Sequence, residues 1–198
     1  MVRMPDAFES SIQKATDIGA VGIIVPTVDD ALEARDAARF SRYPPTGRRS
    51  SGGGSFGQMW PGVNYRATIN DNMLVTVMIE TLEGLKNADA IAKVPGVTAV
   101  FAASGDLGNF SGFRQGTPDY ERAINIVHDA AVKAGVRLCG PIAWRDRPDF
   151  TCFQAGSEPG AIARGVKDEL GKDWNTQPVP EVGPWAGRNP QAGAARPG

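Results

Sequence analysis

The distribution of apolar residues along the chain predicts short buried strands that alternate with amphipathic helices up to about residue 171. A fragment of strand opens the chain, and five apolar runs rich in β-branched residues predict further strands, at residues 19–26, 74–79, 97–102, 136–139 and 151–153. Apolar residues at helical spacing predict helices between them, at about residues 31–41, 82–92, 118–133 and 159–170. Alternation of this kind is typical of an α/β fold in which a parallel sheet is covered by outer helices.

Two segments depart from this alternation. Residues 42–58 contain tandem prolines and three consecutive glycines, Gly52 to Gly54, which predict a long and functional loop. We interpret it as a flap over an active site, where Arg48 or Arg49 meets an acidic substrate, in preference to a phosphate-binding loop, because no Gly-Lys-Ser/Thr follows. Residues 172–198 are rich in proline and glycine and predict a disordered or surface-draped tail after a domain of residues 1–171.

Composition narrows the class of protein. The chain has 198 residues, of which 41% are hydrophobic and 22% charged, and its formal net charge is −1. Nothing therefore favours binding to nucleic acid or to an anionic membrane surface. No apolar run approaches the roughly 20 residues of a membrane span, and no signal peptide opens the sequence, so we expect a cytoplasmic protein. Cys139 and Cys152 lie in apolar stretches, which favours buried free thiols over a disulfide or a metal pair.

Two carboxylates follow neighbouring strands in the predicted order. Glu80 comes directly after the apolar run 74–79, and Asp106 follows the run 97–102 by a few residues. Ligands of parallel α/β folds bind at the carboxyl ends of the strands, where two adjacent carboxylates repel each other unless they share a cation or a proton. Oxygen ligands suit a hard ion such as Mg²⁺ or Mn²⁺. The spacing alone leaves open the alternative that both residues cap helices.

Three motifs in order carry a resemblance to a known family: DIGAVGIIVPTVDDALEARDAARFSRYPPTGRR, then VMIET followed by VPGVTAVF, and then GDL. Over residues 2–171 the chain resembles the HpcH/HpaI aldolase/citrate lyase family, and within it the class II pyruvate aldolases typified by 4-hydroxy-2-oxoheptanedioate aldolase. The resemblance implies a TIM barrel of the phosphoenolpyruvate/pyruvate superfamily. It also implies a lyase that needs Mg²⁺, Mn²⁺ or Co²⁺ and cleaves or forms 4-hydroxy-2-oxo acids, with pyruvate and an aldehyde as the small-molecule partners.

The resemblance also implies roles for particular residues. Glu80 and Asp106 match the two metal ligands, and backbone amides around Gly105 and Asp106 would hold the pyruvate carboxylate. Arg3 matches the arginine that stabilises charge on the enolate oxygen. From their position after a strand, Arg145 and Arg147 are further candidates for an acceptor carboxylate, with local pairing to a neighbouring aspartate as the alternative.

The sequence departs from the family pattern in three places. Met78 stands where the family usually has glutamine, and the connection after Cys139 is shorter than usual. If Arg3 ends the third barrel strand, the barrel is incomplete at its N-terminus and the family's general-base histidine lies outside this chain. The sole histidine, His128, falls within a predicted helix, and we expect it to be structural.

Several interpretations of that incompleteness stay open. The chain is a truncated product, a fragment, or a member that a partner chain completes. A module that binds metal and a 2-oxo acid without catalysis, or another lyase reaction of the superfamily, is the alternative function. Because an incomplete barrel exposes two sheet edges, we expect a homo-oligomer.

Overall fold

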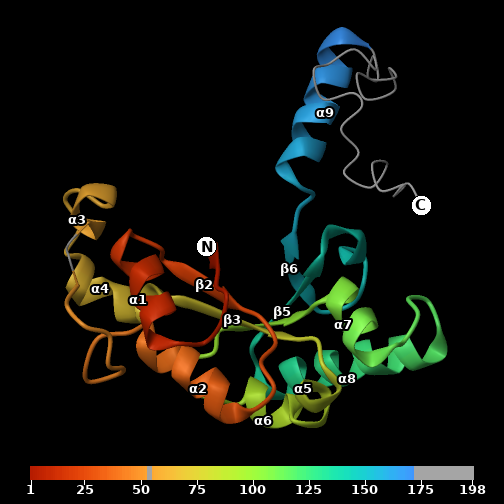
Figure 1. Cartoon of the computed structure of the whole chain (residues 1–198), viewed down its shortest axis with the longest axis horizontal. Helices are drawn as coiled ribbons and strands as arrows, with labels where there is room; N and C mark the ends of the chain where they lie inside the picture. The colour runs from red at the N-terminus through yellow and green to blue at the C-terminus, as the bar shows by residue number, and fades with distance from the viewer. Residues whose placement is uncertain (53–54, 172–198) are drawn as a thin grey trace, which may run out of the picture. The chain divides into compact units, whose positions relative to one another are not determined.

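The computed structural model describes residues 1–52 and 55–171, and it contains one parallel sheet of six strands. The strands lie side by side in chain order and curl into a half-barrel with helices around its outer face (Figure 1). Their bounds are β1 Val2–Arg3, β2 Gly22–Val25, β3 Leu74–Ile79, β4 Ala99–Ala102, β5 Arg137–Pro141 and β6 Phe150–Gln154. The predicted parallel α/β fold is confirmed, and the tail predicted for residues 172–198 lies outside the described residues.

The chain divides into two compact units, Met1–Ala155 and Gly156–Gly198. All six strands belong to the first unit, and the described part of the second contains only α9, Glu158–Leu170. The helices of the first unit are α1 Glu9–Asp17, α2 Ala31–Phe40, α3 Phe56–Met59, α4 Tyr65–Asn72, α5 Leu82–Lys86, α6 Ala88–Ala92, α7 Ser104–Ser111, α8 Pro118–Ala134 and the short 3₁₀ helix η1 Ile142–Trp144. In the described ranges, no helix combines the length and the apolar character needed to cross a membrane.

The ends of the long helices follow local signals in the sequence. The Asp30 side chain accepts hydrogen bonds from the amides of Leu32 (2.7 Å) and Glu33 (2.9 Å) at the start of α2. Helix α8 begins after Thr117 and ends at Gly135, which adopts a left-handed conformation with φ of 70°. These boundaries match the predicted ones because each is set by residues next to it in the chain.

Alternation along β3 divides its side chains between two environments. Val75, Val77 and Ile79 are fully buried in the core beneath the outer helices. The alternate residue Met78 faces the inner side of the half-barrel, in a smaller apolar cluster with Ala99, Phe101, Ala103 and Cys139. Glu80 continues the parity of Met78, so the strand itself directs this carboxylate toward the inner side.

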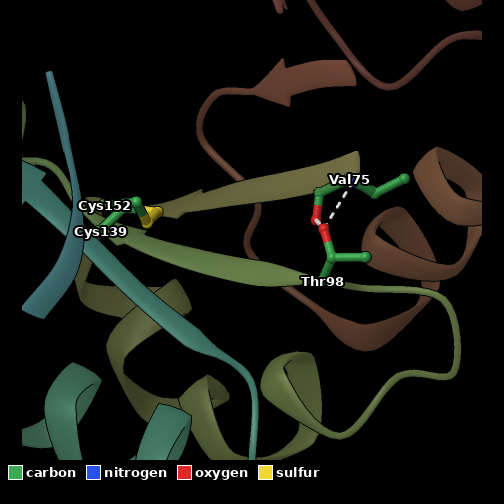
Figure 2. Close-up of a disulfide and its surroundings, with 4 residues drawn as sticks. All are labelled: Val75, Thr98, Cys139 and Cys152. Atoms are coloured by element: carbon green, nitrogen blue, oxygen red, sulfur yellow. Dashed lines mark hydrogen bonds between the residues drawn. A yellow bond between two sulfur atoms is a disulfide. The ribbon is translucent and has the colours of Figure 1, made fainter. Parts of the chain in front are cut away.

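The start of β3 is tied to the segment before β4 by a threonine. The Thr98 hydroxyl accepts a hydrogen bond from the Val75 amide (2.8 Å) and donates one to the Val75 carbonyl oxygen (3.0 Å), as Figure 2 shows. The Thr98 amide also donates to that carbonyl oxygen (2.9 Å). This pairing fixes the register of β3 against β4 at the amino ends, and so fixes the positions of their carboxyl ends.

Cys139 and Cys152 form a disulfide on the inner face, so the prediction of free thiols is wrong (Figure 2). The two residues are register partners on β5 and β6, with their Cα atoms 4.5 Å apart. Strand β6 begins soon after β5 ends, and the short connection between them places both sulfur atoms on the same face. Local sequence patterns do not reveal which residues of two neighbouring strands face each other.

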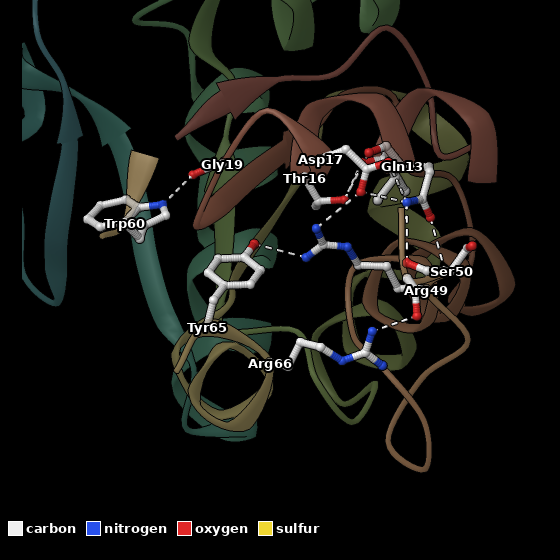
Figure 3. Close-up of polar contacts among 11 residues, drawn as sticks. Gln13, Thr16, Asp17, Gly19, Arg49, Ser50, Trp60, Tyr65 and Arg66 are labelled. Atoms are coloured by element: carbon white, nitrogen blue, oxygen red, sulfur yellow. Dashed lines mark hydrogen bonds and ion pairs between the residues drawn. The ribbon is translucent and has the colours of Figure 1, made fainter. Parts of the chain in front are cut away.

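The loop that begins at residue 42 is packed at the amino ends of the strands, so the prediction of an active-site flap is wrong. Arg42 donates hydrogen bonds to the carbonyl oxygens of Asn70 (3.1 Å) and Met73 (2.9 Å), just before β3 begins. Arg49 is fully buried and donates to the Tyr65 hydroxyl (2.9 Å) and to Asp17 (3.3 Å) at the end of α1 (Figure 3). Its side chain is therefore occupied within the fold and does not face a substrate.

We expect reduction of the disulfide to destabilise the protein. Cys139 and Cys152 are 13 residues apart, and a crosslink that closes a loop of this size typically contributes about 2–4 kcal/mol, in one account by restricting the unfolded chain. Chemical denaturation of the oxidised and reduced protein should show a loss of this size. The same reductant should leave the Cys139→Ala/Cys152→Ala double variant unchanged. Two titratable thiols in the native untreated protein would contradict the assignment.

Candidate active site

Glu80 is the centre of the candidate site, because it is a carboxylate almost completely removed from solvent. It follows the last residue of β3 and is 1% exposed. Its Oε1 atom accepts a hydrogen bond from the backbone amide of Thr27 (2.7 Å), whereas Oε2 is buried with no hydrogen-bond partner among the described residues. A buried carboxylate oxygen without a donor costs free energy, so this atom is available for a cation or a substrate proton.

Thr27, which follows β2, holds Glu80 through an unusual backbone conformation. Its φ is 46°, in the left-handed region that β-branched residues seldom adopt. In this conformation its amide points at Glu80 Oε1. Backbone strain of this kind is concentrated at functional sites, and here it supplies the one hydrogen bond that the described structure gives to the buried carboxylate.

The electrostatics of Glu80 place Asp106 and Arg3 in its surroundings. Burial raises the pKa of Glu80, and the hydrogen bond from Thr27 acts in the opposite direction. The negative charge of Asp106 raises this pKa further, whereas the positive charge of Arg3 lowers it. The charges of Asp106 and Arg3, the other two side chains that the sequence singled out, thus both act on Glu80.

Asp106 lies in the first turn of α7, a helix that the sequence pattern did not predict. Its N-cap residue, Ala103, offers no side-chain hydrogen bond to the helix, so the first amides of α7 have no partner within the helix. A Cβ atom added to Gly105 would meet nothing within 4 Å. The exposed start of α7 therefore presents free backbone donors and positive dipole charge beside Asp106.

Arg3 ends β1 at the mouth of a hollow of about 200 Å³ on the inner face. The hollow is also lined by Thr76, Met78, Phe101 and the disulfide. Met78 is only 5% exposed and packs in the inner apolar cluster. A thioether has no hydrogen-bond donor and is only a weak acceptor, so at this position the inner wall beside the site is apolar.

Asp29 is a further acidic residue whose charge acts on Glu80. Its side chain accepts a hydrogen bond from the Thr81 hydroxyl, and its backbone carbonyl oxygen accepts one from the Asn87 side chain (2.8 Å). Its negative charge contributes to the raised pKa of Glu80. The segment after β2 thus supplies both the amide of Thr27 and an acidic neighbour, a role for which the only sequence signal is its position after a buried strand.

The structure does not bring Arg145 and Arg147 to the group around Glu80. Arg147 donates to both carboxylate oxygens of Glu121 on α8 (2.7 and 3.1 Å) and lies over the Trp144 ring. Arg145 lies 3.8 Å from Asp146. The connection after β5 turns back to the start of β6 and packs against α8. The alternative of pairing with a neighbouring aspartate is therefore present for Arg145 alone, whereas Arg147 pairs with a glutamate of α8.

His128 has a structural position, as expected. It lies on α8, where its Nδ1 atom is 2.8 Å from Asp129 and its Nε2 atom is 3.0 Å from Asp149, just before β6. The hydrogen bond with Asp129, and then that with Asp149, raises the pKa of His128. Both ring nitrogens are engaged, so the only histidine of the chain is not placed to accept a proton near Glu80.

The site provides two carboxylates for a cation. Among the residues that the structure describes, no group of three or more His, Cys, Asp or Glu side chains could hold a metal ion. Glu80 and Asp106 nevertheless suit a hard dication, because the free Oε2 atom of Glu80 is buried and the two negative charges repel. Such an ion would complete its coordination with substrate oxygens and water.

Comparison with known proteins identifies relatives of the whole first unit. The profile of the HpcH/HpaI aldolase/citrate lyase family matches residues 1–163. The 2-keto-3-deoxy-L-rhamnonate aldolase of Klebsiella pneumoniae subsp. pneumoniae is 37% identical over 63% of this chain and 48% of its own length. The hydroxypyruvate/pyruvate aldolase of Pseudomonas aeruginosa is 32% identical over 86% of this chain and 68% of its own. The 4-hydroxy-2-oxovalerate aldolase of Rhodococcus jostii is 36% identical over 70% and 53%.

Solved structures show the same fold. A HpcH/HpaI aldolase/citrate lyase family protein from Burkholderia cenocepacia J2315 superposes with a TM-score of 0.72 and 26% identity, over 86% of this chain and 72% of its own. Macrophomate synthase superposes with a TM-score of 0.71 and 26% identity, over 86% and 64%. The match spans about half to two thirds of the curated relatives' length. The predicted incomplete TIM barrel is confirmed.

The raised pKa of Glu80 predicts how stability depends on pH in metal-free buffer. Because the folded protein holds this proton more tightly than the unfolded chain, the free energy of unfolding should fall as pH rises from the ordinary value of 4.5 through the raised pKa. Each unit of difference between the two pKa values corresponds to about 1.4 kcal/mol. Glu80→Gln removes the titrating group. Denaturation experiments between pH 4 and 8 should therefore show that the free energy of unfolding of this variant increases relative to that of the wild type as pH rises.

The matched control is Glu83→Gln, an exposed acid of α5 paired with Lys86. The pKa of Glu83 is lowered by the Lys86 hydrogen bond, so this variant should not gain on the wild type as pH rises. Parallel pH profiles for the wild type and Glu80→Gln would contradict the proposed burial of the charge.

Proposed function

The chain belongs to the HpcH/HpaI aldolase/citrate lyase family, and on this basis we propose that it is a divalent-metal-dependent class II pyruvate aldolase. The reaction is the cleavage of a 4-hydroxy-2-oxo acid to pyruvate and an aldehyde, or the reverse condensation. The observation that carries the proposal is the buried Glu80 carboxylate, which has one free oxygen beside Asp106 and Arg3. The relatives described above are named as aldolases of keto acids, which supports the same substrate class.

Glu80 and Asp106 are the residues that would hold the metal, with Mg²⁺, Mn²⁺ or Co²⁺ as the candidates. When bound there, a divalent ion polarises the keto group of the 2-oxo acid. The fold shields the first of these ligands, Glu80, from solvent and leaves the second, Asp106, exposed. Glu80 is fixed by Thr27 and by the end of β3, whereas Asp106 lies on the exposed first turn of α7.

The start of α7 and the end of β1 would bind the substrate from two sides. The free amides around Gly105 and Asp106 suit the carboxylate of the 2-oxo acid, because a helix N-terminus presents aligned N–H donors. As the carbon–carbon bond breaks, its electron pair moves toward the keto oxygen of the pyruvate half. Arg3 stabilises that developing negative charge through its own positive charge.

A second function is favoured by the position of His128. The aldol cleavage needs a base for the proton of the 4-hydroxyl group, and this histidine is engaged by Asp129 and Asp149 on another part of the fold. The alternative is a module that binds metal and a 2-oxo acid without turnover, or one that a partner chain completes. Another lyase reaction of the superfamily would use the same metal and 2-oxo acid contacts.

We expect the protein to release pyruvate from short 4-hydroxy-2-oxo acids in the presence of Mg²⁺, Mn²⁺ or Co²⁺, as measured by coupling to lactate dehydrogenase. Glu80→Gln and excess EDTA should each abolish the release, because each removes the metal from the site. Arg3→Ala should lower the rate by about 10²–10³-fold, as for the loss of one group that stabilises an oxyanion. Glu83→Gln, with its exposed side chain, is the matched control and should retain full activity.

Calorimetric titration with oxalate and Mn²⁺ separates the two functions. Metal-dependent binding without pyruvate release would support the non-catalytic module, and loss of binding in Asp106→Asn would support the site in either case. Neither binding nor turnover with any of the three metals would contradict both functions.

The edges of the sheet support a homo-oligomer. Strands β1 and β6 end the described sheet, and each pairs with one neighbour only. Unpaired parallel edges favour association with another chain or another segment. Light scattering coupled to size-exclusion chromatography should therefore give a mass that is a multiple of 21.0 kDa. A monodisperse species of 21.0 kDa across the micromolar range would contradict this prediction.

A further inference from the structure

A second hollow lies at the other end of the sheet from Glu80. Its volume is about 580 Å³, and it is lined by the C-terminal half of α2, by residues 45–48 and by residues 95–96. Residues 95–96 come just before β4 begins, whereas Glu80 follows the end of β3. The two sites therefore lie at opposite ends of parallel strands and share no lining residue.

Four arginines line this hollow, and no acidic residue does. They are Arg35, Arg39, Arg42 and Arg48. Arg35 and Arg39 are four residues apart on α2, where like charges repel each other, and Arg42 follows on the same side. The amide of Arg48 donates a hydrogen bond to the Arg39 carbonyl oxygen (2.8 Å), which brings the fourth side chain to the end of the helix.

The positive charge in the hollow is only partly neutralised. Arg42 is buried, and its guanidinium donates to three backbone carbonyl oxygens, those of Ala38, Asn70 and Met73 (2.9 to 3.2 Å), with no carboxylate. Arg48 pairs with Glu9 through its Nε atom (3.1 Å). Arg35 and Arg39 form no ion pair with any described residue. The attraction of basic residues to a helix C-terminus accounts for Arg39 and for Arg42, which donates to a carbonyl oxygen in the last turn of α2, but not for Arg35 or Arg48.

The loops that line the hollow pack closely against the end of α2. A Cβ atom on Gly47 would lie 2.3 Å from the carbonyl oxygens of Arg39 and Arg42, so the loop touches the helix end. Gly96 has φ of 94°, and a Cβ there would lie 3.0 Å from the Arg42 guanidinium. Pro45 and Pro95 have fixed φ angles and complete the rim. Close backbone contacts thus bring the loop residues of the hollow to the end of α2.

We propose that this hollow binds a small anion that carries a diphosphate group. Guanidinium groups pair with phosphate oxygens through two parallel hydrogen bonds, and several converging arginines match a group with more than one negative charge. The volume lies within the roughly 300–1,000 Å³ of small-molecule pockets. Ala38, Pro45 and Pro95 supply an apolar surface, which suits an organic moiety attached to the diphosphate.

The test is calorimetric titration of the full chain with inorganic diphosphate, ADP and orthophosphate at 0.15 M salt. Diphosphate and ADP should bind with one site per chain and more tightly than orthophosphate. Arg35→Gln and Arg39→Gln should each weaken this binding at least about tenfold, the typical effect of losing a hydrogen bond between charged groups. Tighter binding of ADP than of inorganic diphosphate would show that the apolar rim contacts the organic moiety. Equal binding would show that the hollow recognises the diphosphate group alone.

Arg122→Gln is the matched control, because this exposed arginine lies on α8 and pairs with Asp119 outside the hollow. It should bind diphosphate as the wild type does. Circular dichroism should show that Arg35→Gln and Arg39→Gln remain folded, since neither side chain is buried. The proposal is overturned if millimolar diphosphate and ADP do not bind, or if the control loses as much affinity as the two α2 variants.

Discussion

The site depends on one constraint, the burial of a carboxylate at the end of a buried strand. Removing Glu80 from water raises its pKa, and a fold selected for stability alone would replace it with an apolar residue. The surrounding structure compensates for part of that cost, through the Thr27 amide on one oxygen and the charge of Arg3 nearby. The second oxygen is left without a partner in the described structure. The energetic cost of that arrangement is the physical basis for proposing that a cation binds there.

Strand parity connects this constraint to the rest of the fold. Val75, Val77 and Ile79 secure β3 to the helical layer, so the opposite face of the same strand must point inward, and Glu80 falls on that face. The Thr98 bridge fixes the register of β3 against β4, and α7 begins two residues after β4 ends. The position of Asp106 relative to Glu80 is therefore set by packing and register at a distance from both carboxylates. A one-residue slip of β3 would turn Glu80 into the helical layer.

What the sequence predicted and what it did not can be separated by the range of the interactions involved. Strand β3 and the helices α2 and α8 were predicted because apolar runs and helical spacing are local features of the sequence. Helix α7 was not predicted, because its segment SGDLGNFS contains two glycines and little amphipathic pattern. The helix is stabilised instead by the burial of Leu107 and by a hydrogen bond from the Tyr120 hydroxyl to the Ser104 carbonyl oxygen.

The disulfide and the buried position of Arg49 depend on contacts between distant segments. The position of Glu80 at a strand end was predicted because strand ends are visible in sequence, whereas the left-handed conformation of Thr27 is not.

Helix α2 links the two ends of the sheet through its own charge distribution. Asp30 and Glu33 lie at its start, near the segment that holds Glu80, whereas Arg39 lies in its last turn. Acids at the N-terminus and bases at the C-terminus follow the helix dipole, so the sign of charge at each end needs no ligand to explain it. The end of the helix also accounts for part of the position of Arg42, which donates to the Ala38 carbonyl oxygen, but it does not explain why Arg35 and Arg48 line the same space. That concentration of charge exceeds what a helix terminus requires, and an anion in the hollow would balance it.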